Sequence, residues 1–320
     1  MMMNNILKII KESKKIAISF HTSPDGDSLG SSLGLLQGIR KLNKFAYIIC
    51  KESIPDNFTF LPYSNEIIES NGNVLEGTDC VIILDCGNTA RINGNIELGS
   101  KEYSIINIDH HVSNELYGHL NYVDTNSACM GEIVYQMLKD LNVEVNKDIA
   151  TCLYTSILTD TGSFRYSNTT SVTHSIAGEL INTGIDFSSI HRLVFDSKAF
   201  NRFKLYGMVF DTMELINNQI CVMTVTTDMF TKLNIDPGTD TSDIVSFGNS
   251  IKPVEITILL KEKEDEVKIS LRSKSKIDVR KIAESLGGGG HIRAAGASIK
   301  NKSLREVKSI LIELAENELM

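Results

Sequence analysis

The sequence lacks any long hydrophobic run. No apolar segment approaches the roughly 18 residues that a membrane-spanning helix needs, so we expect no membrane segment and no membrane partner. The start of the chain, MMMNNILKIIKESKK, also lacks the long apolar segment of a signal peptide and predicts a first amphipathic helix. We therefore expect a cytoplasmic protein.

Cysteine is sparse, and its spacing excludes the usual metal-binding pattern. The chain has 6 cysteines in 320 residues, and no two of them form a C-x-x-C pair. Most lie inside apolar periodic segments, which predicts buried thiols rather than disulfides or a zinc ribbon. A purely structural zinc protein is therefore disfavoured. We also find no internal repeat and no low-complexity tract.

An excess of positive charge is missing as well. The formal net charge of −8 argues against tight, non-specific binding to duplex nucleic acid, which depends on many contacts between Lys or Arg and phosphates. The balance is uneven, however, because Val267–Lys308 contains 11 Lys or Arg against 3 acidic residues, a local charge of 11 − 3 = +8. A solvated basic face is the ordinary explanation, and an anion-binding face becomes more attractive because a glycine-rich loop lies inside it.

The order of apolar segments predicts an α/β protein. Strand-like runs alternate with helical patterns through the first half, and Cys80–Leu84 and Tyr103–Ile108 are continuously apolar, as is typical of strands buried in a parallel sheet. At 320 residues the chain has room for two domains. We predict a mostly parallel-sheet domain with helices on both faces, a connecting helical linker and a smaller C-terminal α/β substrate-binding domain, at residues 1–190, 191–217 and 218–320.

One turn carries an unusual concentration of polar side chains. The apolar run Ile16–Phe20 delivers His21, Asp25 and Asp27 to a turn, and a helical pattern over Ser28–Leu42 follows. Helix capping by Asp27 or Ser28 would explain one carboxylate, but it does not explain three such side chains together. Carboxylate oxygens suit hard divalent cations, and imidazole admits Mn, Fe, Zn or Co. These three residues are candidate metal ligands, and an ordinary capped turn is the alternative.

Further candidate ligands lie at three other places: Asp85, the run Asp109-His110-His111, and Asp160. All but Asp160 follow an apolar strand, and the carboxyl ends of parallel strands meet at one edge of a sheet. Asp160, at the end of a helical pattern before Thr-Gly, is also explained by an ordinary turn. Five carboxylates with imidazoles exceed what one tetrahedral zinc takes. Two cations about 3.5–4 Å apart that share a bridging carboxylate use them better, and such a pair polarises a phosphoryl group and activates water.

The glycine-rich loop is the second candidate site. Four consecutive glycines, Gly287–Gly290, have a high backbone entropy cost, and they let main-chain N–H groups approach an anion closely. We expect a helix to begin near His291 and to add a favourable dipole. Arg272, Ser273 and Arg293 lie in the same basic segment. A flexible linker is the alternative, but the loop leads directly into Ala294-Ala295-Gly296, which we interpret as a close-packing helical sequence.

Five ordered segments resemble the motifs of the DHH phosphoesterase family: HTSPDGDSLGSSLGL, VIILDCG, IDHH, TDTGSFR and GGGGHIRAAG. The match spans nearly the whole chain. It is closest to the short two-domain branch, the NrnA-type nano-RNases that also act as phosphoadenosine-phosphate phosphatases. Linear-dinucleotide phosphodiesterases of cyclic-di-AMP turnover belong to the same branch. No metal-ligand position departs from the family pattern.

The resemblance implies a role for each matching residue. It implies that His21, Asp25 and Asp85 hold one manganese ion, with Asp85 bridging to a second. Asp27, His110 and Asp160 would complete the second site. His111 would face the scissile phosphate, and Asp109 would orient its neighbours. The C-terminal domain would grip the terminal nucleotide across a cleft, and its matching residues are Arg272, Ser273, Gly288, Gly289, Gly290, His291 and Arg293.

We therefore expect a two-metal phosphoesterase, with Mn²⁺ as the cation and Mg²⁺, Co²⁺ or Zn²⁺ as alternatives. Its substrates would be very short single-stranded RNA, including linear dinucleotides such as pApA, and adenosine 3′,5′-bisphosphate. The net negative charge favours short substrates, since long polyanions would be repelled. Two alternatives stay open: a non-catalytic nucleotide sensor of the same fold and an inorganic pyrophosphatase-like hydrolase. Monomer and homodimer are both compatible with the sequence.

Overall fold

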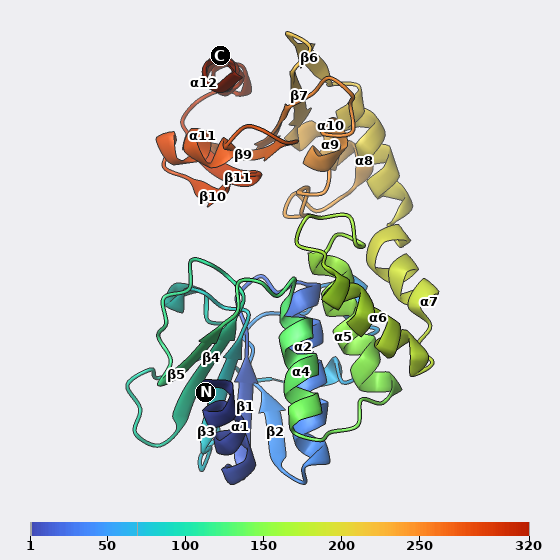
Figure 1. Cartoon of the computed structure of the whole chain (residues 1–320). Coiled ribbons are helices and arrows are strands. Elements are labelled where there is room, and N and C mark those ends of the chain that lie inside the picture. Colours follow the sequence, from blue (N-terminus) through green and yellow to red (C-terminus); the bar gives the residue numbers. More distant parts are fainter. Residues whose placement is uncertain (1, 69, 320) are drawn as a thin grey trace. The chain divides into compact units, whose positions relative to one another are not determined.

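The computed structural model describes residues 2–68 and 70–319, which form two compact units that divide between Ser197 and Lys198 (Figure 1). The first unit contains, in chain order, α1 (Met2–Glu12), β1 (Lys15–Ser19), α2 (Gly26–Lys41), β2 (Phe45–Ile48), η1 (Asp56–Phe58), α3 (Asn65–Ile68), β3 (Cys80–Leu84), η2 (Thr89–Arg91), β4 (Ser104–Asp109), β5 (Leu120–Val123), α4 (Met130–Asp140), α5 (Lys147–Asp160), α6 (Ser171–Asn182), α7 (Phe187–His191) and the π-helical turn η3 (Arg192–Asp196).

A five-stranded parallel sheet in the order β2-β1-β3-β4-β5 organises the first unit. The central strand β3 is buried along its whole length, which explains its uninterrupted apolar sequence, CVIIL. Because β1, β3 and β4 are adjacent and parallel, their carboxyl ends lie side by side at one edge of the sheet. The predicted parallel α/β architecture is confirmed.

The helices lie on one face of this sheet. Side chains of α1, α2, α4 and α5 share one core with the strand residues that point to that side, among them Ile16, Ile82 and Ile106. The opposite strand residues pack instead under non-helical segments that contribute Val74 and Leu98. We expected helices on both faces; loops cover the second face because the connection from β3 to β4 contains only the short turn η2.

The start of α2 differs from the expected one in its capping residue. Asp25, rather than Asp27 or Ser28, is the N-cap: its side chain accepts hydrogen bonds from the backbone N–H groups of Asp27 and Ser28, and the Ser28 side chain accepts one from the Asp25 N–H. This reciprocal pair is a capping box. The helix therefore begins at Gly26, two residues before the expected start, and Asp27 lies in its first turn.

The second unit is built on a six-stranded mixed sheet in the order β10-β11-β9-β8-β7-β6, in which β7 and β8 are parallel and the other pairs antiparallel. Helices α11 and α12 cover one face, and α8, α9 and α10 cover the other over β7 and β8. Its elements are α8 (Phe200–Phe210), β6 (Glu214–Ile216), β7 (Ile220–Val225), α9 (Thr227–Leu233), α10 (Val245–Gly248), β8 (Ile256–Glu262), β9 (Glu266–Ser273), α11 (Val279–Ser285), β10 (Gly289–His291), β11 (Ala294–Lys300) and α12 (Leu304–Leu319).

Two segments of the second unit adopt a structure that the sequence did not suggest. In the segment 191–217, which we expected to be a helical linker, α8 ends at Phe210 and Glu214–Ile216 forms the edge strand β6. The prediction of a helix that begins near His291 is wrong, because this segment is a hairpin of β10 and β11. Among the described helices, none is both long enough and apolar enough to cross a bilayer.

Candidate metal centre

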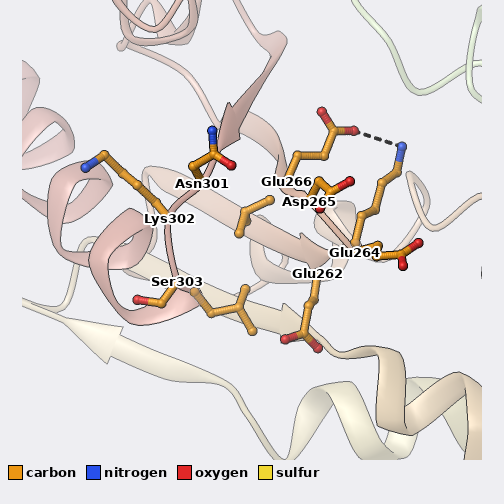
Figure 2. A pocket seen from close by; sticks show the side chains of 10 residues that line it. Glu262, Glu264, Asp265, Glu266, Asn301, Lys302 and Ser303 are labelled. Atoms are coloured by element: carbon orange, nitrogen blue, oxygen red, sulfur yellow. Dashed lines mark hydrogen bonds and ion pairs between the residues drawn. The ribbon is translucent and has the colours of Figure 1, made fainter.

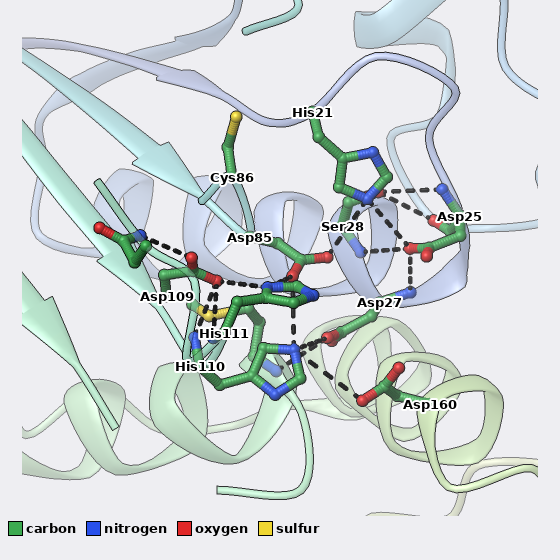
Figure 3. Close-up of polar contacts among 12 residues, drawn as sticks. His21, Asp25, Asp27, Ser28, Asp85, Cys86, Asp109, His110, His111 and Asp160 are labelled. Carbon is green, nitrogen blue, oxygen red and sulfur yellow. Dashed lines mark hydrogen bonds and ion pairs between the residues drawn. The ribbon is translucent and has the colours of Figure 1, made fainter. Parts of the chain in front are cut away.

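The side chains predicted to bind metal converge at the carboxyl edge of the parallel sheet (Figure 3). His21 lies two residues after the end of β1, Asp85 directly follows β3, and Asp109 is the last residue of β4. His110 and His111 continue from β4. Because these strands are neighbours, three separate parts of the chain meet at one place. The remaining ligand candidates come from helices: Asp25 and Asp27 from the start of α2, and Asp160 from the end of α5.

A close contact between α2 and α5 brings Asp160 to the site. Glycines recur every fourth residue along α2, so they share one face of the helix, and a Cβ at Gly30 would lie 2.4 Å from the backbone oxygen of Cys152 in α5. Gly131 in α4 is equally confined, because a Cβ there would lie 2.2 Å from Ser156 Oγ. Larger residues at these positions would push the helices apart. The glycines therefore permit the short separation that the site requires.

Asp85 lies at the centre of the cluster. Its Oδ2 is 3.4 Å from His21 Nε2, and its Oδ1 is 3.4 Å from His110 Nε2. The side chain is 3% exposed, and its Oδ1 has no hydrogen-bond partner among the described residues. A buried carboxylate oxygen without a donor has a large desolvation cost that a bound cation would offset. The two oxygens of Asp85 face two different sets of ligand atoms.

Those two sets have the composition of divalent-metal sites. His21, Asp25 and Asp85 form one group and Asp27, His110 and Asp160 another, and within each group the ligand atoms lie within 4.8 Å of one another. His21 Nε2 is 3.7 Å from Asp25 Oδ1, and His110 Nε2 is 3.5 Å from Asp27 Oδ2. Both groups mix carboxylate oxygens with one imidazole, a set that suits Mn²⁺ and related ions. The residues present thus fit a pair of cations.

Hydrogen bonds fix the orientation of the histidine rings. His21 Nδ1 lies 2.8 Å from the carbonyl oxygen of Thr22, and His110 Nδ1 lies 3.4 Å from that of Ser127. If each Nδ1–H donates to its carbonyl, the Nε2 lone pair of each ring points toward Asp85. Metal-binding histidines commonly have this arrangement, in which one ring nitrogen faces the metal and the other, here Nδ1, donates to a carbonyl.

Asp27 is held by donors from two helices. Its carboxylate accepts hydrogen bonds from the backbone N–H groups of Met130 (2.9 Å) and Gly131 (3.3 Å) at the start of α4, and from the Ser156 hydroxyl in α5. The positive end of the α4 dipole also favours a negative charge here. These supporting residues could not be predicted from the sequence, since backbone donors and a lone serine leave no pattern in it.

Asp109 supports its neighbours from a fully buried position. Its Oδ1 accepts hydrogen bonds from the backbone N–H groups of His110 (2.8 Å) and His111 (3.3 Å) and lies 2.8 Å from His111 Nδ1, while Asn114 donates to its Oδ2. The Asp109–His111 bond leaves Nε2 as the free nitrogen of His111, whose side chain is 33% exposed. His111 is therefore an oriented imidazole that is open to solvent.

The pKa values show how strongly the cluster favours positive charge. Burial lowers the pKa of His21, but the neighbouring Asp25 and Asp85 carboxylates outweigh it and raise this pKa to about 10. Burial also lowers the pKa of His110, which Asp85 and Asp27 raise to about 10. Burial raises the pKa of Asp160 to about 6. In the metal-free protein at neutral pH, both imidazoles are protonated and offset part of the negative charge of the carboxylates.

These shifts predict that metal binding releases protons. A cation can bind the Nε2 atoms of His21 and His110 only after they lose protons, so saturation with Mn²⁺ at pH 8 should release about two protons per chain. Apparent affinity should rise between about pH 7 and pH 9, because protons compete with the metal below a pKa of about 10. Calorimetric titration in buffers of different ionisation enthalpy measures the release. His21→Gln should reduce it by about one proton; binding with no proton release would contradict the ligand assignment.

The residues predicted to bind substrate lie in the second unit, around β9 and the β10–β11 hairpin. The register places Arg272 of β9 beside Ala294 of β11, and Ala294 beside His291 of β10. The Arg293 guanidinium donates to Ser273 Oγ (3.3 Å) and to the Ile277 carbonyl (2.9 Å), so Arg293 and Ser273 belong to one local network. The structure thus groups these residues within one part of this unit.

The expected helix at His291 is replaced by a hairpin because the small residues after the loop pair with β9. Ala295 and Ala297 point into the core over α11, and Gly288 and Gly290 pack against β11 so closely that a Cβ would lie 2.2 Å and 2.6 Å from the oxygens of Gly296 and Ala294. Alanine and glycine have low strand propensity, so tertiary pairing decides the structure here. The helix-dipole contribution to anion binding is therefore absent.

The second unit has a pocket that lies away from the predicted substrate-binding residues. It lies between the β8–β9 turn and the segment before α12, and Figure 2 shows Glu262, Glu264 and Asp265 around it, with Glu266 paired to Lys263 at 3.1 Å. None of the predicted substrate residues lines it. Its acidic lining would repel phosphate, so we assign it no role in nucleotide binding.

Fold and site together define a class: α/β proteins with a candidate binuclear metal centre at the carboxyl edge of a parallel sheet, followed by a second mixed-sheet unit. Comparison with known proteins identifies the family. The model of the DHH family N-terminal domain matches residues 15–157, and that of the DHHA1 domain matches residues 217–317. The chain belongs to the DHH family, which confirms the resemblance found in the sequence.

Individual relatives agree with this assignment. The chain is 34% identical to the bifunctional oligoribonuclease and PAP phosphatase NrnA of Thermus thermophilus, over 95% of this chain and 90% of that one. It is 28% identical to the Bacillus subtilis protein of the same name, over 98% and 97%. A crystal structure of an exopolyphosphatase-related protein from Bacteroides fragilis superposes with a TM-score of 0.90 at 27% identity, covering 98% of this chain and 95% of that one.

Proposed function

We propose that this protein is a phosphoesterase that hydrolyses very short oligoribonucleotides to mononucleotides. Its substrates include linear dinucleotides such as pApA, which cyclic-di-AMP turnover produces, and it also dephosphorylates adenosine 3′,5′-bisphosphate. The observation that carries the proposal is the buried Asp85 carboxylate, whose two oxygens face separate groups of ligand atoms. The names of the relatives, oligoribonuclease and PAP phosphatase, support the choice of substrates.

The ligand set supports two manganese ions. His21 and Asp25 would hold one, Asp27, His110 and Asp160 would hold the other, and Asp85 would contribute to both. When bound, the pair would polarise the phosphoryl group and lower the pKa of a bound water. Mixed carboxylate and imidazole ligands favour Mn²⁺ over Mg²⁺, which prefers oxygen ligands and retains its waters.

His111 acts on the substrate in this proposal. The buried Asp109 carboxylate holds Nδ1 and fixes the ring, so Nε2 is presented toward solvent at the edge of the metal centre. There it can donate a hydrogen bond to a phosphoryl oxygen. The hydrogen bond with Asp109 is the chief cause that raises the pKa of His111, and this shift favours the protonated ring that can donate.

The second unit supplies nucleotide recognition in this proposal. Arg272, Arg293 and His291 are cationic or hydrogen-bonding groups suited to a terminal phosphate, and Gly288–Gly290 carry no side chain that would block its approach. The local excess of positive charge around them serves a short substrate, whereas the overall charge of −8 disfavours long polyanions. All six cysteines are free and buried, which supports a protein that acts in the reducing cytoplasm.

Substrate length provides the test. With Mn²⁺ added, we expect turnover of linear diadenylate and of two- to five-nucleotide RNA, release of phosphate from adenosine 3′,5′-bisphosphate, and at least about tenfold lower kcat/KM on a long RNA. Side-by-side assays of these substrates measure it, with inorganic pyrophosphate as the comparison substrate. Tight nucleotide binding without turnover would instead identify a sensor, and preferred cleavage of pyrophosphate would identify a pyrophosphatase. Either result would overturn the proposal.

A further inference from the structure

The turn that follows Asp160 has an unusual backbone. Gly162, Ser163 and Phe164 are three consecutive residues with positive φ, of +53°, +61° and +62°. The left-handed region is unfavourable for serine and phenylalanine because of their Cβ atoms. Such strain persists only where surrounding interactions hold it, and it tends to occur at functional sites. This turn begins directly after a candidate metal ligand.

Several interactions hold the left-handed turn. Ser163 N–H donates to the Leu158 carbonyl (2.8 Å), and Phe164 N–H donates to Thr161 Oγ1 (3.0 Å). The Phe164 ring stacks on His174 with ring centroids 5.1 Å apart. None of these contacts uses the Ser163 hydroxyl, which has a further partner.

That partner is His191, the last residue of α7. Its Nε2 lies 3.2 Å from Ser163 Oγ, and its Nδ1 lies 3.4 Å from Asp196 Oδ2. Residues 191 and 196 would not face each other on an α-helix. The intervening turn η3 is π-helical, and its wider i→i+5 repeat brings Asp196 over His191. The Asp196 carboxylate near Nδ1 favours a proton on that nitrogen, which leaves Nε2 as an acceptor for the serine hydroxyl.

The order serine, histidine, carboxylate resembles a nucleophilic triad, but the surroundings of Ser163 exclude that role. An acyl- or phosphoryl-transfer serine needs free donors for the developing oxyanion. The N–H groups of Ser163 and Phe164 already donate within the turn, and those of Arg165 and Tyr166 donate to the Thr161 carbonyl. The network therefore holds the turn rather than attacking a substrate.

We propose that Ser163, His191 and Asp196 are positioning residues for the metal centre. They lock the left-handed turn, and the turn fixes the end of α5 and hence the direction of the Asp160 carboxylate, whose Oδ2 is 3.9 Å from His110 Nε2. This inference rests on the proposed function because it takes Asp160 as a ligand. Loss of the network loosens one ligand of the cation site formed by Asp27, His110 and Asp160, and leaves the site of His21 and Asp25 intact.

The test compares His191→Ala with Arg192→Ala. Arg192 is the next residue, is exposed, and its guanidinium bonds to Ser189. In His191→Ala we expect the weaker of two Mn²⁺ affinities to fall about tenfold, as measured by calorimetry without substrate. Excess Mn²⁺ should restore most of kcat, and KM for linear diadenylate should stay within about twofold. Arg192→Ala should behave as wild type.

Two further variants separate positioning from folding. Ser163→Gly removes the hydroxyl but relieves the left-handed strain, so it should keep the melting temperature while weakening Mn²⁺ binding as His191→Ala does. His191→Gln keeps an acceptor near Ser163 and should restore part of the affinity. Unchanged Mn²⁺ affinities in His191→Ala, or equal losses in Arg192→Ala, would overturn the inference. Since Mn²⁺ binding is measured without substrate, failure of the proposed hydrolysis would show separately, as an inactive wild type.

Discussion

Asp85→Asn abolishes hydrolysis while the chain stays folded; this is the first result that we expect. Asp85 is the residue whose two carboxylate oxygens face His21 on one side and His110 on the other. An amide removes the one negative charge that both candidate cation sites share. Loss of metal-derived stabilisation of several kcal/mol corresponds to a fall in kcat/KM of at least about 10³-fold. Steady-state assays on linear diadenylate measure it.

Asparagine is the right replacement because Asp85 has a φ of +53°, a conformation that Asn tolerates better than Ala. The folded state should therefore survive, which circular dichroism checks. Asp140→Asn, at an exposed carboxylate that ends α4, is the matched control and should retain wild-type activity. An Asp85→Asn protein that still binds metal and hydrolyses the dinucleotide would refute the bridging role.

Removal of metal should have an equally large effect. Exhaustive chelation should bring hydrolysis to background, and added Mn²⁺ should restore it, because the cations supply the charge that the phosphoryl oxygens need. Mn²⁺ should also stabilise the fold, by about 2.7 kcal/mol when its free concentration is 100 times Kd. Thermal melts with and without Mn²⁺ measure this shift, which Asp85→Asn should lack. Full activity after verified metal removal would contradict the account.

The clustering of the candidate ligands was predictable because each of them follows a feature that the sequence displays. Continuously apolar strands such as Cys80–Leu84 are easy to recognise, and the residue after each strand is fixed by chain order. Parallel strands then bring Asp85 and the Asp109–His111 run together without any knowledge of loops. Asp160 was the weakest case from spacing, since it ends a helix rather than a strand.

The parts that the sequence did not predict depend on contacts between distant segments. The glycines of α2 matter because of what faces them, for example the Cys152 backbone opposite Gly30. Four-residue glycine spacing on a helix was the available signal. The β10–β11 hairpin was mistaken for a helix because Ala and Gly favour no strand on their own, and pairing with β9 decides their conformation. His191 had no motif around it, and its partner Asp196 faces it only through the π-helical turn.

The central claim is that Asp and His side chains from separate segments hold two cations through a shared Asp85 carboxylate. The most direct measurement is a Mn²⁺ titration of the metal-free protein that is monitored by electron paramagnetic resonance. We predict two Mn²⁺ per chain and the spectrum of an exchange-coupled pair, with Asp85→Asn losing the coupling. A single bound ion, or two ions without magnetic coupling in the wild-type protein, would contradict the account.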